Sequence, residues 1–200
     1  PPLGRALLGG GTPSLAQRPT NHSNMTKQLS TLYLAGGCFW GTQHYLKQIA
    51  GVVATSVGYA NGTTPYPTYD KVCTGTTGHA EAVRVDFDPQ VLPLALLVRL
   101  YFRSIDPTSI NRQGNDIGTQ YRTGVYYTSP DQLPAIEAEH QQLEAELGET
   151  SVVEILPLHS YYEAEDYHQD YLDHHPTGYC HLPKALFDYA RTANAQGQQP

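Results

Sequence analysis

The chain has 200 residues, a net charge of −7 and 40% hydrophobic residues. This length supports one domain with a sizeable core, and the negative charge argues against a general nucleic-acid binder. The longest apolar stretch, residues 91–102, is interrupted by Pro93 and Arg99 and is too short to span a bilayer. We therefore expect a soluble, cytoplasmic monomer, or an organellar protein if residues 1–30 are the remnant of a transit peptide.

Residues 1–30 are expected to lie outside the folded domain, because they are rich in Gly, Pro, Ser, Thr and Asn and contain no acidic residue. We expect a disordered leader, a transit segment or a cloning remnant there. The folded domain is expected over residues 31–182, with a C-terminal tail over 183–200.

Hydrophobic periodicity and turn residues divide the domain into strands and helices. Strands are expected at 31–35, 52–60, 78–88, 123–129 and 152–158. Helices are expected at 39–51, 94–105 and 129–148, before a Tyr-rich helical stretch. This order predicts an α+β fold, a two-layer α/β sandwich with a split βαβ (ferredoxin-like) core and a long irregular C-terminal tail.

Cys38 stands in LAGGCFWG (34–41), where the expected strand passes through two glycines into the expected helix. Unpaired N–H groups and the dipole at a helix start stabilise a thiolate, and no acidic residue precedes Asp70. We expect a reactive Cys38 with a lowered pKa, beside an apolar slot walled by Phe39 and Trp40. Distant acids that fold back would oppose this effect, and a small buried structural cysteine is the alternative.

Glu81 lies in GHAEAVRVDFD (78–88), whose alternation places it on one strand face with His79 and three large apolar residues. A carboxyl group on a buried face has a raised pKa and keeps its proton near neutrality, so Glu81 is a candidate acid. His79 is a candidate substrate-binding residue beside it. The alternative is a Glu81 that reaches water, or that pairs with His79 or an arginine.

Two polar segments supply further candidates. Asp116 and Tyr121 lie in a long loop and are candidates for orienting a substrate, while Tyr69 in TYDKVC is a candidate phenolic donor. The chain has 15 tyrosines, so Tyr69 and Tyr121 can equally be packed rings with hydrated hydroxyls.

The three cysteines are too few and too scattered for a disulfide framework and fit a reducing compartment. Cys180 follows Pro, Thr, Gly and Tyr, a composition typical of a mobile tail. We expect it to act as a resolving thiol for Cys38, which requires Cα atoms within about 4.4–6.8 Å; an inert cysteine is the alternative. Cys73 is expected to be a spectator.

The histidines near the C-terminus do not have the spacing of a metal site. His168 is six or seven helical positions, about 10 Å, from His174 and His175, so no metal is expected. Two other classes remain open at this point. One is a cysteine hydrolase with His79 or His44 as base, and the other is a redox-sensing or metal-binding interaction module.

Five segments taken together resemble the type-A peptide methionine sulfoxide reductases, over residues 30 to 182. They are GGCFWG, PTYDKVCTGTTGHAEAV, GNDIGTQYRTGVYY, YYEAEDYHQDYL and GYC. The resemblance implies an α/β sandwich with Cys38 as nucleophile and Glu81 as the acid near the sulfoxide oxygen. It also implies that Phe39 and Trp40 hold the substrate methyl group. The polar end of the substrate would be bound by Tyr69, Asp116 and Tyr121.

The resemblance implies a redox cycle that repairs proteins under oxidative stress. Cys38 would attack the sulfur of methionine sulfoxide (S epimer), free or in proteins, become a sulfenic acid and form a disulfide with Cys180. A thioredoxin-like donor would reduce that disulfide, with no metal or organic cofactor. Some relatives carry two cysteines in a Gly-rich tail, whereas this tail has Cys180 alone, so one resolving cysteine is expected.

Overall fold

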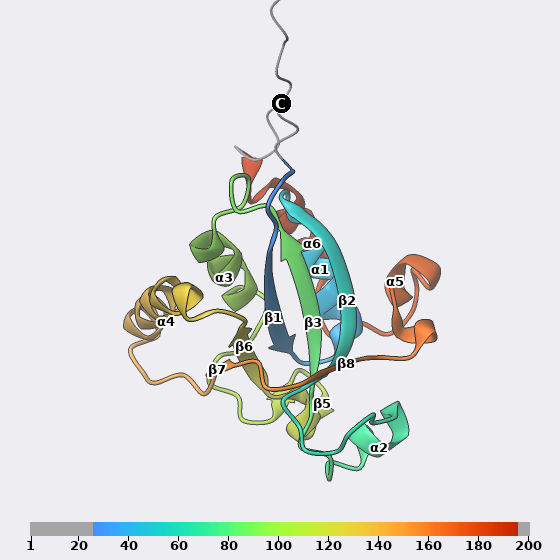
Figure 1. The fold of residues 1–200 in the computed structure, drawn as a ribbon. Coiled ribbons are helices and arrows are strands. Elements are labelled where there is room, and N and C mark those ends of the chain that lie inside the picture. Colours follow the sequence, from blue (N-terminus) through green and yellow to red (C-terminus); the bar gives the residue numbers. More distant parts are fainter. Residues whose placement is uncertain (1–25, 196–200) are drawn as a thin grey trace, which may run out of the picture.

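The computed structural model describes residues 26–195, so most of the expected leader and the last five residues lie outside it (Figure 1). The strands of the main sheet are β1 Ser30–Gly36, β2 Val52–Ala60, β3 Ala80–Phe87, β6 Thr123–Tyr127, β7 Glu154–Pro157 and β8 Tyr161–Glu163. A small hairpin pairs β4 Arg112–Gln113 with β5 Asp116–Ile117. The helices are α1 Phe39–Leu46, α2 Tyr69–Cys73, α3 Leu94–Phe102, α4 Leu133–Leu147, α5 Tyr171–His174 and α6 Lys184–Thr192.

The main sheet has the strand order β7-β6-β1-β3-β2-β8. β3 lies between β1 and β2 and is antiparallel to both, while β1 lies between β3 and β6. Each βαβ unit, β1-α1-β2 and β3-α3-β6, is therefore split by a strand of the other. This confirms the predicted ferredoxin-like core, to which β7 and β8 add one edge strand each.

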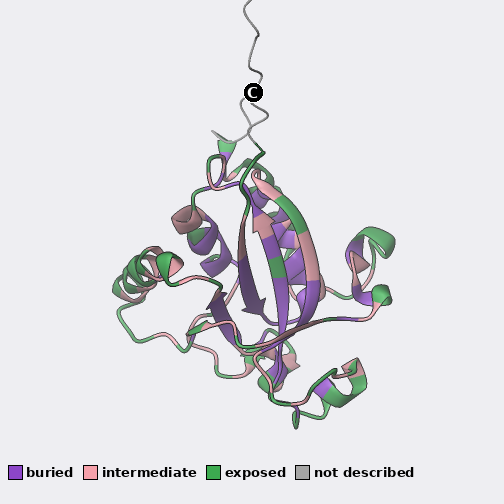
Figure 2. Ribbon diagram, in the orientation of Figure 1, coloured by how far each residue is buried: buried purple, intermediate pink, exposed green. Residues whose placement is uncertain are grey.

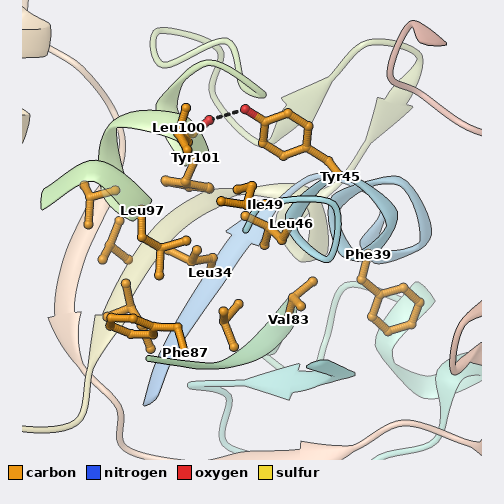
Figure 3. Packing of buried hydrophobic residues seen from close by; sticks show 14 of the residues in the cluster. Leu34, Phe39, Tyr45, Leu46, Ile49, Val83, Phe87, Leu97, Leu100 and Tyr101 are labelled. Atoms are coloured by element: carbon orange, nitrogen blue, oxygen red, sulfur yellow. Dashed lines mark hydrogen bonds between the residues drawn. The ribbon is translucent and has the colours of Figure 1, made fainter. Parts of the chain in front are cut away.

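The helices α1 and α3 cover one face of the sheet, which makes the two layers (Figure 1). The predicted face of β3 is buried there, because Val83, Val85 and Phe87 have no exposed surface. Figure 3 shows this packing, in which the Tyr45 hydroxyl of α1 donates to the Leu100 carbonyl of α3 at 2.6 Å. The alternation of β3 is thus a reliable guide to which side chains meet the helical layer.

Two expectations for the C-terminal part are wrong. The Tyr-rich stretch forms β8 and the short α5 rather than one helix, because its polar side chains bond to the sheet. The Gln169 amide donates to and accepts from the backbone of Val57 in β2, at 2.9 and 2.8 Å. The tail is not irregular throughout, since α6 packs against the core through Phe187 and Ala190.

Burial decreases from the centre of the molecule outward. Figure 2 shows buried residues concentrated in the sheet and α1, with exposed residues prominent on α2, α4 and α5. The helix expected over 39–51 ends at Leu46, and a turn through Gly51, at φ +100°, leads into β2. No helix within residues 26–195 is long and apolar enough to cross a membrane.

Candidate active site

The antiparallel pairing of β1 and β3 brings the end of one strand and the start of the other to the same edge of the sheet, the lower edge in Figure 1. The chain leaves β1 through Gly37, whose φ of +85° favours glycine, and Cys38 then caps the N-terminus of α1. Glu81 is the second residue of β3. The two residues that the sequence analysis singles out for chemistry are therefore neighbours across the sheet.

The first turn of α1 directs its free N–H groups at these two side chains. The Phe39 N–H donates to Glu81 Oε2 at 3.0 Å, and the N–H groups of Trp40 and Gly41 bond to the Cys38 thiol. These groups have no partner within the helix, so the site uses donors that every helix start provides. Cys38 is 8% exposed and Glu81 is 1% exposed.

Burial controls the protonation of both groups. It raises the pKa of Glu81 to about 8, against the smaller opposite effect of the Phe39 N–H. Burial also raises the pKa of Cys38 well above its usual range, and the negative charges of Glu81 and Asp116 raise it further. The expectation of a lowered Cys38 pKa is wrong, because loss of hydration outweighs the helix start. Near neutral pH a protonated Glu81 does not repel the sulfur, and burial together with the charge of Asp116 keeps Cys38 a thiol.

An aromatic slot lies beside Cys38. Trp40 stacks on Tyr171 with ring centroids 3.7 Å apart, and its indole N–H donates to His168 Nδ1 at 3.0 Å. The His168 ring is fully buried, with its centroid 5.0 Å from that of Phe39 and 4.6 Å from that of Tyr69. Burial lowers the pKa of His168, so it is neutral and carries its proton on Nε2. His168 therefore fixes the Trp40 ring.

From the sequence, His168 is considered only as a possible metal ligand, and no role is predicted for Tyr171. Both residues lie in the segment YYEAEDYHQDYL, which belongs to the family resemblance but has no function assigned to it from the sequence. No group of three or more His, Cys, Asp or Glu residues within 26–195 is placed to hold a metal ion.

The polar candidates gather around Glu81. The Tyr69 hydroxyl is hydrogen-bonded to the Cys73 thiol, and burial, followed by this bond, raises the Tyr69 pKa. Burial raises the Tyr121 pKa as well, and the charges of Glu81 and Asp116 raise it further. Both phenols are therefore protonated and able to donate. Asp116 Oδ2 accepts a 2.9 Å hydrogen bond from the Tyr179 hydroxyl, which ties the tail to the hairpin.

His79 has a different environment from the one expected of a substrate-binding residue. Its Nδ1 accepts from the Gly62 N–H at 3.0 Å, so its Nε2 carries the proton and donates to the Thr64 carbonyl at 2.7 Å. Both ring nitrogens thus hold the loop that follows β2. The other candidate base, His44, has Nδ1 3.4 Å from an Asp173 oxygen and its ring against Phe187.

Cys180 lies against the first turn of α1. A Cβ added to Gly41 would stand 3.0 Å from the Cys180 sulfur and 2.9 Å from Nδ1 of His181. The Leu182 N–H donates to the same sulfur at 3.4 Å. Both Cys38 and Cys180 are free thiols in this structure. The Gly41 N–H thus bonds to Cys38, and the Cys180 sulfur occupies the space where a side chain at Gly41 would begin.

We expect Gly41→Ala to slow disulfide formation between Cys38 and Cys180 by at least about tenfold, or about 1.4 kcal/mol. The new methyl group would displace the segment carrying Cys180, while the Gly41 N–H bond to Cys38 remains. Rapid quenching and mass spectrometry after one turnover would follow the disulfide. Ala138→Ser, on an exposed face of α4, is the control. An unchanged rate of disulfide formation would contradict the close contact.

Comparison with known proteins agrees with this arrangement. The family model described as peptide methionine sulfoxide reductase matches residues 30–199. The peptide methionine sulfoxide reductase MsrA of Lachnoclostridium phytofermentans is 49% identical over 163 residues, which is 82% of this chain and 98% of that protein. The MsrA of Clostridium acetobutylicum is 49% identical over 79% of this chain and 98% of its own length.

The chain belongs to the peptide methionine sulfoxide reductase family.

Solved structures of the family share the fold of this reductase. Reduced Mxr1 of Saccharomyces cerevisiae has a TM-score of 0.73 at 38% identity, over 76% of this chain and 88% of that one. Methionine sulfoxide reductase A of Corynebacterium diphtheriae has a TM-score of 0.69 at 39% identity, over 78% and 84%. These findings confirm the family, the fold class and the oxidoreductase activity implied by the sequence motifs. The family match also includes α6, which those motifs do not reach.

Proposed function

We propose that this reductase uses Cys38 as the nucleophile and Glu81 as the acid in reducing the S epimer of methionine sulfoxide, free or within proteins. One observation carries the proposal. The Phe39 N–H holds Oε2 of a buried Glu81 whose pKa is about 8, at the same helix start that binds the Cys38 thiol. Because Oε2 accepts that bond, Oε1 is the oxygen available to carry the proton.

The first step transfers oxygen from the substrate to the enzyme. Glu81 donates its proton, or a strong hydrogen bond, to the sulfoxide oxygen as the Cys38 sulfur attacks the substrate sulfur. The S–S bond formed in this attack breaks as the oxygen passes to the Cys38 sulfur, which leaves methionine and Cys38 sulfenic acid, so the substrate gains two electrons and the Cys38 sulfur loses them. The proton from Glu81 stays on the sulfenic oxygen, and the proton of the thiol returns Glu81 to its protonated form.

The surrounding side chains support this chemistry. Phe39 and Trp40 offer apolar surface to the substrate methyl group, with Trp40 fixed by its bond to His168. Tyr69 and Tyr121 are protonated phenols in the electrostatic neighbourhood of Glu81 and can share the hydrogen bonding of the oxygen. Asp116 is proposed to orient the polar end of the substrate.

The second step regenerates the enzyme. Cys180 attacks the Cys38 sulfenic acid, which forms a disulfide and releases water. A thioredoxin-like dithiol then reduces this disulfide by thiol exchange, so that the cycle needs an external reductant and no organic cofactor. In support, the yeast relative Mxr1 is known both in a reduced form and in an unusual oxidized form, the latter with a TM-score of 0.58 at 36% identity.

A single-turnover experiment tests the proposal. Fully reduced protein mixed with racemic methionine sulfoxide, without added reductant, is expected to release one methionine per chain and to consume only the S epimer. Peptide mapping is expected to show a Cys38–Cys180 disulfide and a free Cys73. Turnover of the R epimer, or a disulfide that involves Cys73, would overturn the corresponding part of the proposal.

A further inference from the structure

His181 lies on the glycine-rich turn that carries Cys38. Its Nε2 is 3.0 Å from the Gly36 carbonyl oxygen. A carbonyl only accepts hydrogen bonds, so Nε2 carries a hydrogen and Nδ1 of the neutral ring has a lone pair. This Nδ1 is buried and has no hydrogen-bond partner among the described residues. A buried acceptor without a partner is unusual and calls for a functional explanation.

The lone pair of His181 is close to the resolving thiol. The Nδ1 atom and the Cys180 sulfur lie 2.9 and 3.0 Å from one point, the position that a Cβ on Gly41 would occupy. The N–H of the same Gly41 bonds to the Cys38 thiol. Gly41 is therefore adjacent to all three groups: Nδ1 of His181, the Cys180 thiol and the Cys38 sulfur that Cys180 attacks.

The second step of the cycle requires a proton acceptor at this place. Only the thiolate is an effective nucleophile, and burial raises the pKa of Cys180, with a smaller contribution from Asp116. The charge of Asp116 raises the pKa of both His181 and Cys180, and its Oδ2 accepts a hydrogen bond from the Tyr179 hydroxyl. The hollow on the outer side of Cys180 is lined by further titratable groups, namely His44, Asp173, Lys184 and Arg191.

We propose that Nδ1 of His181 takes the proton of Cys180 as its sulfur attacks the Cys38 sulfenic acid, and delivers it to the departing hydroxide. The S–S bond forms, the S–O bond of Cys38 breaks, and the hydroxide and the proton leave as one water. The Cys180 sulfur supplies the electron pair of the new S–S bond, so that the two sulfurs end at the same oxidation level, and His181 ends neutral as it began. The inference rests on the proposed function, because it concerns the second step of that cycle.

The state of His181 near neutral pH suits this role. Burial lowers its pKa, although the bond to the Gly36 carbonyl and the charge of Asp116 act in the opposite direction. The ring is therefore neutral and its lone pair is available without prior loss of a proton. The Gly36 bond fixes the tautomer and aims Nδ1, as expected of a positioned base.

The test compares His181→Gln with wild type in single turnovers between pH 6 and 9. A glutamine amide can still donate to the Gly36 carbonyl but has no basic nitrogen at the Nδ1 position. We expect methionine release to be unchanged and disulfide formation to fall by about 10²-fold near neutral pH, the lower range for general bases. His159→Gln, at an exposed histidine with no place in the proposed cycle, is the control and should match wild type.

The pH profile separates a base from a structural support. Wild-type disulfide formation should be nearly independent of pH above the His181 pKa, whereas the variant rate should rise about tenfold per pH unit as Cys180 ionises. An unchanged rate, or a slower rate with the wild-type profile, would overturn the inference. Loss of methionine release in wild type itself would instead contradict the proposed function, so the two failures are distinguishable.

Discussion

Cys38→Ser is expected to abolish methionine sulfoxide reduction, with no methionine released above the uncatalysed background. A serine hydroxyl at the start of α1 keeps the shape of the site but cannot take the sulfoxide oxygen as a stable oxidised intermediate. The measurement is methionine formation from protein-bound and free methionine sulfoxide in the presence of excess dithiol. This loss should be the largest of any single substitution.

Two control variants sharpen this result. Cys73→Ser should retain turnover, because Cys73 is hydrogen-bonded to the Tyr69 hydroxyl and takes no part in the proposed redox cycle. Cys180→Ser without reductant should release one methionine per chain and stop at the Cys38 sulfenic acid, which a sulfenic-acid-specific reagent would label. Retained turnover in Cys38→Ser would contradict the nucleophile assignment altogether.

Glu81→Ala is expected to slow the first step by about 10²–10⁴-fold, the usual contribution of general acid catalysis. Glu81→Gln should retain an intermediate rate, because its amide can donate a hydrogen bond but no proton. The wild-type rate should fall as the pH rises through about 8, where Glu81 loses its proton, and Glu81→Gln should not show this fall. Single-turnover methionine release between pH 6 and 9 measures both effects.

The same carboxyl group makes stability depend on pH. The pKa of Glu81 is raised from 4.5 in the unfolded chain to about 8 in the folded one. The stability of the fold at this carboxyl group is therefore greatest below pH 4.5, and it falls as the pH rises to about 8. The slope is about 1.4 kcal/mol per pH unit within that window. Glu81→Gln should therefore lose less stability than wild type between pH 5 and 8, as measured by urea unfolding. Equal losses would show that Glu81 is not held protonated.

The success of the sequence analysis depended on local patterns. The alternation in β3 was sufficient to place Glu81 on the buried face, and β2 spans the expected residues 52–60. The Gly-Gly-Cys segment was sufficient to place Cys38 at a helix start. Each of these features is determined by neighbours in the sequence, through side-chain period and turn geometry.

The failures arose where distant segments meet. The Cys38 pKa depends on burial beneath the rest of the fold and on Glu81 and Asp116, which no local pattern brings next to it. The roles of His168 and His181 rest on contacts with residues more than 100 positions away, at Trp40 and Gly36. Helix α6 is short and polar on average, so its few apolar side chains gave too weak a signal.

The Gln169 side chain also protects the sheet against pairing with other molecules. Its amide bonds to the backbone of Val57 as a neighbouring strand would, and so it shields part of an edge from pairing with another molecule. The same short segment supplies His168 and Tyr171 to the aromatic slot. One short segment thus both protects the sheet against intermolecular strand addition and completes the aromatic slot beside Cys38.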